Sequence, residues 1–340
     1  MKNKIKFAVV GCGNIGKRHA AMIEQNEEAE LVALIDIEPK EELGIEQFSA
    51  PFFNSLDAFL ASNPDVDVIN IATPNGLHYA QALQCLEKNK HILVEKPMAL
   101  SQKEAVHIVN FARQKDRRVF TVMQNRYSSP SVWIKSVIDQ KMLGEIYIVQ
   151  VNCFWNRDER YYREKSKEWR GTRLLDGGCL FTQFSHFIDI LYWLFGDIKN
   201  IYSKFNNFNH QSLTEFEDSG VVTFDFINGG TGSLNFSTSV WNSNLISSLT
   251  IIGEKGSVKI GGQYMNVIQH CHIENYTQPV IHPHESYNDY GIYKVSAANH
   301  QFVIENIVHL LKGRPYDLPS PDESIAVIGM IERIYNSGKK

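Results

Sequence analysis

A glycine-rich turn near the N-terminus constrains the fold of this chain more than any other feature. Gly11, Gly13 and Gly16 form a G-x-G-x-x-G pattern, which follows the apolar run Lys6–Val10 and precedes a helical pattern. Glycines at this spacing let the backbone approach a ligand closely, and the amides at the start of the helix, including those of Asn14 and Ile15, can bind a pyrophosphate. The motif alone is weak evidence, so its context decides what it means.

Asp36 supplies that context. It lies 20 residues after Gly16, at the end of a second apolar run, where a carboxylate can accept hydrogen bonds from the ribose hydroxyls of an adenosine. A carboxylate there repels a 2′-phosphate, and no arginine follows in Ile37-Glu38-Pro39. The pattern therefore favours NAD over NADP, with Ile37 beside the ribose. The alternative is a glycine turn next to a solvated aspartate.

The rest of the chain divides into two parts. In residues 1–125, short apolar runs alternate with amphipathic segments, which is typical of βαβ units and a parallel doubly wound sheet. Residues 126–340 contain longer alternating segments, typical of antiparallel strands with one covered face. We therefore expect an α/β protein with an NAD-binding Rossmann domain, followed by an α/β domain with an open, mostly antiparallel sheet. The expected strands are Lys6–Val10, Leu31–Ile35, Val66–Ala72, His91–Val94, Val119–Val122, Glu145–Phe154, Gly220–Phe226, Thr231–Ser237 and Ser247–Ile252, and the expected helices of the second part are Pro130–Gln140, Gly178–Phe195, Ala297–Lys312 and Pro321–Asn336.

Two strand ends of the first part carry polar side chains. One strand ends in Thr73-Pro74-Asn75 with His78 shortly after, and the next ends in Glu95-Lys96-Pro97. Ligands of open α/β sheets bind at the carboxyl ends of strands, so both loops should face the nicotinamide. A lysine fixed by a following proline can contact a reacting hydroxyl. A surface lysine beside a turn proline is the alternative.

The predicted helix Gly178–Phe195 carries a polar stripe on an otherwise apolar segment. Thr182, His186 and Asp189 lie at i, i+4 and i+7, so a continuous helix would place them on one face. A histidine in such a stripe suits proton exchange with an alcohol, because its pKa is near neutral. The alternative is that His186 and Asp189 are buried polar groups that satisfy each other.

The segment from Asn156 to Arg173 has a local excess of positive charge. It holds seven basic and four acidic residues, interleaved with tyrosines and a tryptophan. Guanidinium groups and aromatic faces suit phosphate, carboxylate and a uracil ring, so the segment is consistent with an anionic substrate. A solvated loop with compensating charges explains it as well. The basic residues are Arg157, Arg160, Arg163, Lys165, Lys167, Arg170 and Arg173.

Composition excludes several classes of protein. A net charge of −4 argues against a nucleic-acid binder. No apolar run approaches the roughly 18 residues of a membrane span, and the N-terminal run lacks the cleavage site of a signal peptide. Five scattered cysteines without a C-x-x-C pair indicate a reducing compartment, so the expected location is the cytoplasm. We expect no metal, although His270, His272, His282 and His284 leave a zinc site open as an alternative.

These motifs, in this order and spacing, resemble those of the Gfo/Idh/MocA oxidoreductase family over essentially the whole chain. The resemblance implies that Lys96 and His186 act on a sugar or polyol hydroxyl while a hydride passes to NAD(P). It also implies that the open sheet of the second domain forms a homodimer or homotetramer. Further cofactor contacts would come from Gln124, and from Trp169 and Arg170 near the nicotinamide.

Within that family, the chain is most similar to the UDP-N-acetylglucosaminuronate (UDP-GlcNAcA) 3-dehydrogenases of bacterial surface-polysaccharide synthesis. Threonine at position 182 departs from the usual Asp or Asn, and it cannot act as a carboxylate base. The expected activity is therefore oxidation of C3 of a UDP-sugar acid by NAD, with the proton taken by His186 or Lys96. The alternatives are a dehydrogenase of a free sugar, inositol or dihydrodiol, and an NAD-binding regulator without catalysis. The stretches that carry this resemblance are Trp155-Asn156-Arg157, Tyr161-Tyr162, Trp169-Arg170-Gly171-Thr172, Thr182-Gln183-Phe-Ser185-His186 and 248–262, and the expected substrate contacts are Lys96, Arg157, Tyr161, Tyr162, Thr182, Gln183 and His186.

Overall fold

The computed structural model describes residues 4–164, 167–263, 265–281, 287–290, 293–297 and 299–338. Packing divides the chain into two compact units. The first comprises Met1–Met123 and His300–Ile328, and the second comprises Gln124–Asn299 and Gly329–Lys340. The chain passes from the first unit to the second after Met123, close to the expected boundary at residue 125. The segment His300–Ile328, however, belongs to the first unit, whereas the expected division assigned it to the second domain.

The first unit contains a parallel six-stranded sheet in the order β3-β2-β1-β4-β5-β6. This is the order of a Rossmann fold, in which the chain reverses direction across the sheet between β1 and β4. The expected fold class is confirmed, and the expected strands agree with the observed ones to within about two residues at each end, which is the usual uncertainty of such boundaries. The strands are β1 (Ile5–Val10), β2 (Ala29–Ile35), β3 (Phe52–Phe53), β4 (Val68–Ile71), β5 (His91–Val94) and β6 (Val119–Thr121).

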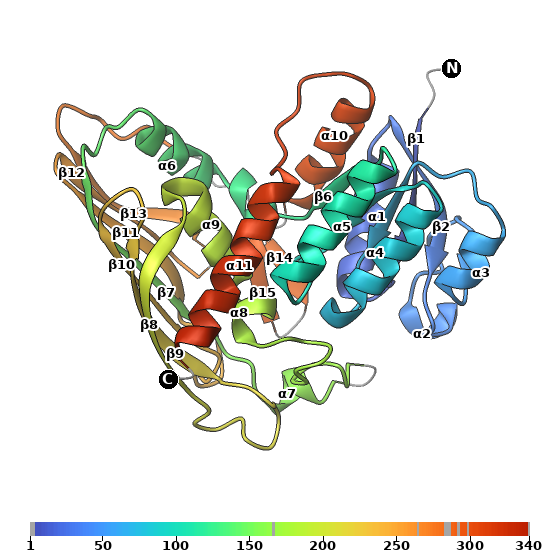
Figure 1. The fold of residues 1–340 in the computed structure, drawn as a ribbon, viewed down its shortest axis with the longest axis horizontal. Helices are drawn as coiled ribbons and strands as arrows, with labels where there is room; N and C mark the ends of the chain where they lie inside the picture. The colour runs from blue at the N-terminus through green and yellow to red at the C-terminus, as the bar shows by residue number, and fades with distance from the viewer. Residues whose placement is uncertain are drawn as a thin grey trace. The chain divides into compact units, whose positions relative to one another are not determined.

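The helices of the first unit cover both faces of this sheet. Right-handed crossovers that leave the centre in opposite directions place α1 and α4 on opposite faces. Accordingly, α1 packs against α10 and α4 packs against α5, and Figure 1 shows α4 and α5 side by side in front of the strands. The helices are α1 (Asn14–Gln25), α2 (Lys40–Leu43), α3 (Leu56–Ala61), the 3₁₀ turn η1 (Asn75–Leu77), α4 (His78–Glu87), α5 (Gln102–Gln114) and α10 (His300–Leu311).

The second unit is built on a seven-stranded sheet in the order β13-β12-β11-β7-β10-β9-β8. Neighbouring strands are antiparallel except for β7 and β10, which run parallel. The expected open, mostly antiparallel sheet is therefore confirmed, with one exception inside it. Its strands are β7 (Ile146–Phe154), β8 (Ile198–Asn206), β9 (Ser219–Phe226), β10 (Thr231–Ser237), β11 (Ile246–Gly253), β12 (Gly256–Gly261) and β13 (Val267–Ile273), and a separate ribbon pairs β14 (Tyr287–Tyr290) with β15 (Tyr293–Ala297).

One face of this sheet is apolar and carries the helix on which His186 lies. Phe184 packs on Phe236 with ring centroids 5.3 Å apart, and Phe195 packs on Phe226 at 5.1 Å. These contacts lie at the two ends of α9, so α9 is fixed along its length. Among the described residues, none of the helices is long and apolar enough to cross a membrane. The helices of this unit are η2 (Gln124–Tyr127, 3₁₀), α6 (Ser129–Asp139), α7 (Glu159–Tyr162), α8 (Cys179–Thr182) and α9 (Ser185–Phe195), while α11 (Pro321–Ser337) is divided between the two units.

The single long helix expected over Gly178–Phe195 is wrong. The chain forms α8, turns at Gln183 and Phe184, and then forms α9. The amide of Phe184 donates to the carbonyl of Cys179, five residues earlier, at 3.0 Å. This i to i−5 hydrogen bond widens the turn and changes the direction of the chain. Burial of the Phe184 ring and bonds made by the Gln183 carboxamide stabilise this break. The spacing of Thr182 and His186 therefore does not place them on one continuous helix face.

Candidate active site

Two of the three glycines of the turn, Gly11 and Gly16, leave no room for a side chain. Gly11 has φ +85°, and a Cβ there would lie 2.7 Å from the backbone of Ala72. A Cβ on Gly16 would lie 1.8 Å from the carbonyl oxygen of Gly11. After Gly13, α1 begins without a side-chain cap and without an acidic residue in its first turn. The first amides of this helix and its dipole thus suit a negatively charged group, as a dinucleotide pyrophosphate requires.

Asp36 is tied to this turn at the carboxyl end of β2. Its Oδ2 accepts a hydrogen bond from the amide of Cys12 at 2.6 Å, and its Oδ1 accepts one from the amide of Glu38 at 3.0 Å. The carboxylate is therefore held beside the pyrophosphate turn, which is where an adenosine ribose would be bound. The next side chain, Ile37, is 85% exposed.

The two polar strand ends are joined by a buried histidine. The ring of His78, at the start of α4, has Nδ1 2.8 Å from the carbonyl of Pro97 and Nε2 2.9 Å from the carbonyl of Thr73. Thr73 also donates through its hydroxyl to Gln81 at 2.6 Å. His78 thus holds the loop after β4 and the loop after β5, which contains Lys96, together. The contact predicted between His78 and the cofactor stays a prediction, because both ring nitrogens face the backbone.

In the second unit, His186 contacts Gln124. The amide of Gln124, on η2, donates from Nε2 to Nε2 of His186 at 3.2 Å, and both side chains are buried. An imidazole that accepts a hydrogen bond at Nε2 is unprotonated at that nitrogen, which is the state of a general base. The amide of Asn299 donates to the backbone carbonyl of Gln124 at 3.3 Å, which further fixes η2.

Asp189 pairs with Arg126 and not with His186. The guanidinium donates from Nη2 to Oδ1 at 2.6 Å and from Nε to Oδ2 at 2.9 Å, and the two side chains are 8% and 1% exposed. Such a bidentate buried pair fixes both partners in orientation. It joins η2 to α9 one turn after the contact between Gln124 and His186. The alternative in which His186 and Asp189 satisfy each other is therefore wrong. Sequence analysis missed Arg126, since an arginine after a strand carries no local signal of burial.

Thr182 points to a different group from His186. Its hydroxyl donates to the backbone carbonyl of Asp176 at 2.8 Å and contacts the carboxylate of the same residue. The other carboxylate oxygen of Asp176 accepts the amide of Gly171 at 2.7 Å. Thr182 therefore lies in a network that orders the loop before α8, and its predicted contact with substrate stays a prediction.

Arg157, Tyr161 and Gln183 form a compact group. The Arg157 guanidinium is buried, lies 4.9 Å from the ring of Trp155 and 5.2 Å from that of Tyr161, and donates from Nε to Gln183 Oε1 at 2.9 Å. Gln183 in turn donates to the Tyr161 hydroxyl at 2.7 Å. The Arg170 guanidinium also contacts this group, because it lies 4.1 Å from the centre of the Tyr161 ring. The structure thus brings together four of the side chains expected to bind substrate or cofactor.

Most other charges of this segment have partners of opposite sign. Arg160 pairs with Asp158, Arg163 with Glu159, and Arg170 with Glu164. The alternative of a solvated loop with compensating charges therefore describes the outer residues, whereas Arg157 and Gln183 are buried. Tyr162 is buried too, and burial raises the pKa of its hydroxyl well above the usual value. Lys165 lies outside the described residues.

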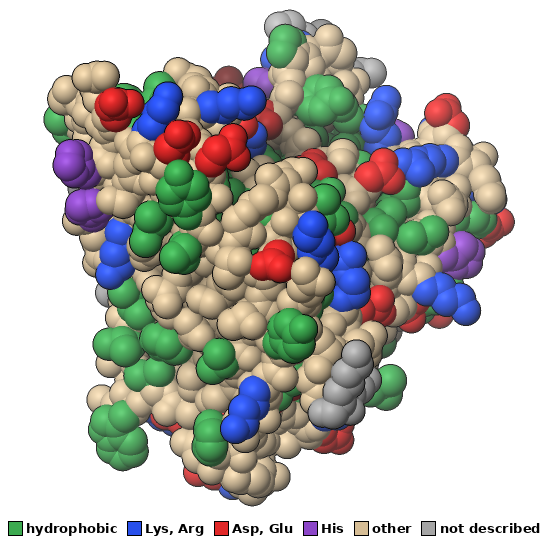
Figure 2. All heavy atoms as spheres, turned by 60° about the vertical axis from the view of Figure 1, so that its left-hand side comes forward, with side chains coloured by type: hydrophobic (Ala, Val, Ile, Leu, Met, Phe, Trp, Pro, Cys, Tyr) green, Lys and Arg blue, Asp and Glu red, His purple; other side chains and the backbone are tan. Residues whose placement is uncertain are grey.

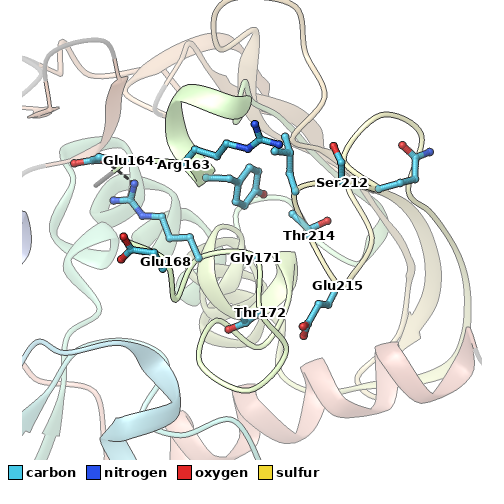
Figure 3. Close-up of a pocket in the computed structure, with 12 residues that line it drawn as sticks. Arg163, Glu164, Glu168, Gly171, Thr172, Ser212, Thr214 and Glu215 are labelled. Carbon is cyan, nitrogen blue, oxygen red and sulfur yellow. Dashed lines mark hydrogen bonds and ion pairs between the residues drawn. The ribbon is translucent and has the colours of Figure 1, made fainter. Parts of the chain in front are cut away.

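A cavity of about 490 Å³ opens beside this segment, between residues 162–172 and 211–215. Figure 3 shows Arg163, Glu164 and Glu168 on one wall and Ser212 and Thr214 on the other. The lining carries both signs of charge, so the cavity is no simple anion site. It borders the Arg157 group through Tyr162 and Arg170.

Two of the four histidines that could bind zinc, His270 and His272, lie on β13 at the edge of the second unit's sheet. His270 and His272 are exposed on β13, where the ring of His270 bonds Ser257 Oγ at 2.9 Å. His282 and His284 lie outside the described residues.

Comparison with known proteins decides the family. Residues 5–123 match the model of an oxidoreductase family with an NAD-binding Rossmann fold, and residues 132–259 match the GFO/IDH/MocA C-terminal domain. The chain belongs to the Gfo/Idh/MocA oxidoreductase family. It is an NAD-dependent oxidoreductase, and the residues matched by the Rossmann model include the glycine turn and Asp36.

Three known proteins that are similar to this chain indicate what members of the family act on. The WlbA dehydrogenase of Chromobacterium violaceum, solved with NADH and UDP-GlcNAcA, is 32% identical with a TM-score of 0.88, over 99% of this chain and 94% of that one. The WlbA dehydrogenase of Bordetella pertussis, solved with the same two ligands, is 32% identical with a TM-score of 0.87, over 99% and 97%. Glucose-6-phosphate 3-dehydrogenase of Bacillus subtilis is 31% identical over 193 residues, 56% of this chain and 53% of that protein.

Proposed function

We propose that the protein is an NAD-dependent dehydrogenase that oxidises a secondary hydroxyl of a nucleotide-linked sugar acid, most simply C3 of UDP-GlcNAcA. The observation that carries this proposal is full-length similarity at 32% identity to two dehydrogenases solved with NADH and UDP-GlcNAcA. The buried Arg157 group supports it independently, since a guanidinium stacked on aromatic rings suits an anionic, partly aromatic ligand. The product would enter surface-polysaccharide or lipopolysaccharide synthesis.

In the proposed reaction, the C–H bond of the carbinol breaks and its hydride passes to NAD, while the O–H proton passes to a base. His186 is the proposed base, because Gln124 donates to its Nε2 and so favours the unprotonated ring. Lys96 orients the hydroxyl and stabilises its alkoxide character. The roles of the two residues could be exchanged, and the pH dependence of each variant would tell them apart.

The cofactor contacts follow the family pattern. The amides of the turn from Gly11 to Gly16 bind the pyrophosphate, and Asp36 binds the ribose hydroxyls and excludes a 2′-phosphate. Thr73-Pro74-Asn75 and Glu95-Lys96 border the nicotinamide. Trp169 and Arg170 are proposed contacts of the cofactor from the second domain. Tyr161, Tyr162, Thr182 and Gln183 are proposed, with Arg157, to line the substrate site.

We propose a homodimer or homotetramer that forms through the outer face of the second unit's sheet. The paired register places Ile148 and Ile252 side by side on this face, and both are about half exposed. Tyr202 and Val221 extend the exposed apolar surface across β8 and β9. Figure 2 shows hydrophobic side chains scattered over this side of the molecule between polar ones. A second copy of the same face is the proposed occupant, because the face could then bury its exposed apolar side chains against their equivalents in a symmetric dimer. Free cysteines support a cytoplasmic location.

A substrate panel followed by NADH absorbance tests the activity. UDP-GlcNAcA should give turnover, while UDP-GlcNAc, which lacks the carboxylate, should be at least about tenfold poorer, because a buried guanidinium would lose its anionic partner. Free inositol and free glucose, both unphosphorylated, are the matched controls for the alternative in which a free sugar is the substrate. Activity confined to those two compounds would refute the proposal, and NAD binding without any turnover would favour a regulator.

A further inference from the structure

Glu95 is a buried carboxylate one residue before Lys96. β5 ends at Val94, and the amide of Glu95 continues the pairing with β4 by donating to the carbonyl of Ile71 at 2.9 Å. The carboxylate then turns back on the chain, so that Oε2 accepts the backbone amide of Lys96 at 3.1 Å. The side chain of Glu95 therefore holds the backbone from which Lys96 extends.

Two histidines from distant parts of the sequence surround this carboxylate. His19, on α1, has Nε2 2.8 Å from Glu95 Oε1, and His300, the first residue of α10, has Nε2 3.6 Å from the same oxygen. Both rings are buried, and they meet edge to face with centroids 5.3 Å apart. Asn70 donates to Nδ1 of His19 at 3.4 Å, so the proton of His19 lies on Nε2 and is donated to Glu95.

This arrangement keeps Glu95 ionised. Burial alone would raise the pKa of Glu95, but the hydrogen bond from His19 and the nearby ring of His300 lower it well below the usual value. An ionised carboxylate accepts the Lys96 amide more strongly than a neutral one does. On the other side of Lys96, His78 contacts the carbonyl of Pro97. The Lys96 backbone is thus held on both sides by buried side chains.

We propose that Glu95, supported by His19 and His300, is a positioning residue that fixes the backbone of Lys96 for contact with the reacting hydroxyl. This inference rests on the proposed function, in which Lys96 touches the substrate. It also assigns a role to the segment that begins at His300 and belongs to the first unit. This segment starts α10, whose first residue, His300, then helps to hold the loop that carries Lys96. A displacement of about 1 Å at a reacting group can cost about a hundredfold in rate, so such support has a measurable effect.

The first test measures hydrogen exchange of the Lys96 amide in the ligand-free full-length protein. In Glu95→Gln, the carboxamide presents its NH2 group to either His19 or the Lys96 amide, both of which are donors. Exchange at Lys96 should rise at least about tenfold, because a charge-assisted hydrogen bond is lost. Exchange in β1 (Ile5–Val10) should stay unchanged. Equal acceleration in β1 would show general destabilisation and overturn the inference, as would unchanged exchange at Lys96.

Matched variants separate support of Glu95 from folding. His19→Gln keeps a donor near Nε2 and should preserve protection of the Lys96 amide, whereas His19→Leu should lose it. His300→Leu should weaken it, while His309→Leu, a partly exposed histidine on the same helix, should have no effect. Equal protection in His19→Gln and His19→Leu would overturn the inference. So would one equivalent of zinc in the purified protein whose removal by chelator exposes the Lys96 amide, since the three side chains would then serve a metal.

Kinetics provides the second readout. With a turned-over substrate, Glu95→Gln should lower kcat at least about tenfold while the Kd of NADH changes less than about threefold, because Glu95 acts through Lys96. Combining Glu95→Gln with Lys96→Met should lower kcat no further than Lys96→Met alone. Additive losses would overturn the positioning role. If the wild type turns over no UDP-sugar but the exchange results hold, the proposed function fails and the structural inference about the Lys96 backbone stands.

Discussion

The buried ion pair between Asp189 and Arg126 gives the sharpest stability prediction. Asp189→Asn removes the charge that the Arg126 guanidinium faces at 2.6 and 2.9 Å, while a carboxamide oxygen can still accept one of the two hydrogen bonds. Removing one partner of a buried pair costs about 3–5 kcal/mol, so with one bond retained we expect a loss of about 3 kcal/mol in the free energy of unfolding. For a unit of this size, that loss corresponds to a decrease in Tm of about 6–12 °C.

Tryptophan fluorescence during urea denaturation measures this loss, because all five tryptophans lie in the second unit and Trp193 stacks on Arg126 at 5.4 Å. The control is Asp322→Asn, which breaks a well-exposed pair with Arg113. We expect that control, followed by far-ultraviolet circular dichroism because Asp322 lies in the first unit, to cost less than about 1 kcal/mol.

The double variant Arg126→Met Asp189→Leu should recover most of the stability, since matched apolar side chains replace a buried pair at little cost. Turnover should stay low in that double variant, because η2 would no longer hold Gln124 against His186. A loss in Asp189→Asn no larger than that of the exposed control would show that the buried pair contributes no more to stability than an exposed one.

Three further predictions concern other sites. Burial raises the pKa of Glu217 to about 7, so its protonated form is favoured in the folded state, and the stability this contributes is full below about pH 4.5 and is lost as the pH rises through 7. Glu217→Gln should remove up to about 3 kcal/mol of the difference in unfolding free energy between pH 5 and pH 8, and an unchanged pH profile in urea denaturation would contradict this. Asp36→Ala with Ile37→Arg should shift preference toward NADP by at least about tenfold in kcat/KM, and undiminished NAD affinity by fluorescence titration would count against the ribose contact. Gly16→Ala should weaken NADH binding at least about tenfold, because the new Cβ would lie 1.8 Å from a carbonyl oxygen, and unchanged affinity would show that the turn does not bind the pyrophosphate.

The geometry of the glycine turn and the position of Asp36 could be predicted because their signals are local. The turn from Gly11 to Gly16 and the position of Asp36 depend on backbone geometry within one βαβ unit, and the structure reproduces both. The parallel sheet follows from the alternation of short apolar runs with helical patterns. The loops at Thr73 and Lys96 follow the carboxyl ends of β4 and β5, where open α/β sheets bind ligands.

The remaining features depend on contacts between distant residues. His19 and His300 meet at one carboxylate although most of the chain separates them, and no local pattern pairs them. The return of His300–Ile328 to the first unit has the same cause. The break between α8 and α9 was missed because the apolar pattern is continuous there, while the bonds that Gln183 makes to Arg157 and Tyr161 favour a turn.

The proposed activity transfers a hydride from C3 of a UDP-sugar acid to NAD. UDP-GlcNAcA deuterated at C3, incubated with NAD and the full-length protein, tests it when the NADH is analysed by mass spectrometry. We predict that the NADH carries the deuterium, and that substrate deuterated at C4 gives unlabelled NADH. The variants His186→Asn and Lys96→Met should form NADH from either substrate much more slowly than the wild type. Unlabelled NADH from the C3-deuterated substrate, or no NADH from any UDP-sugar acid, would contradict the account.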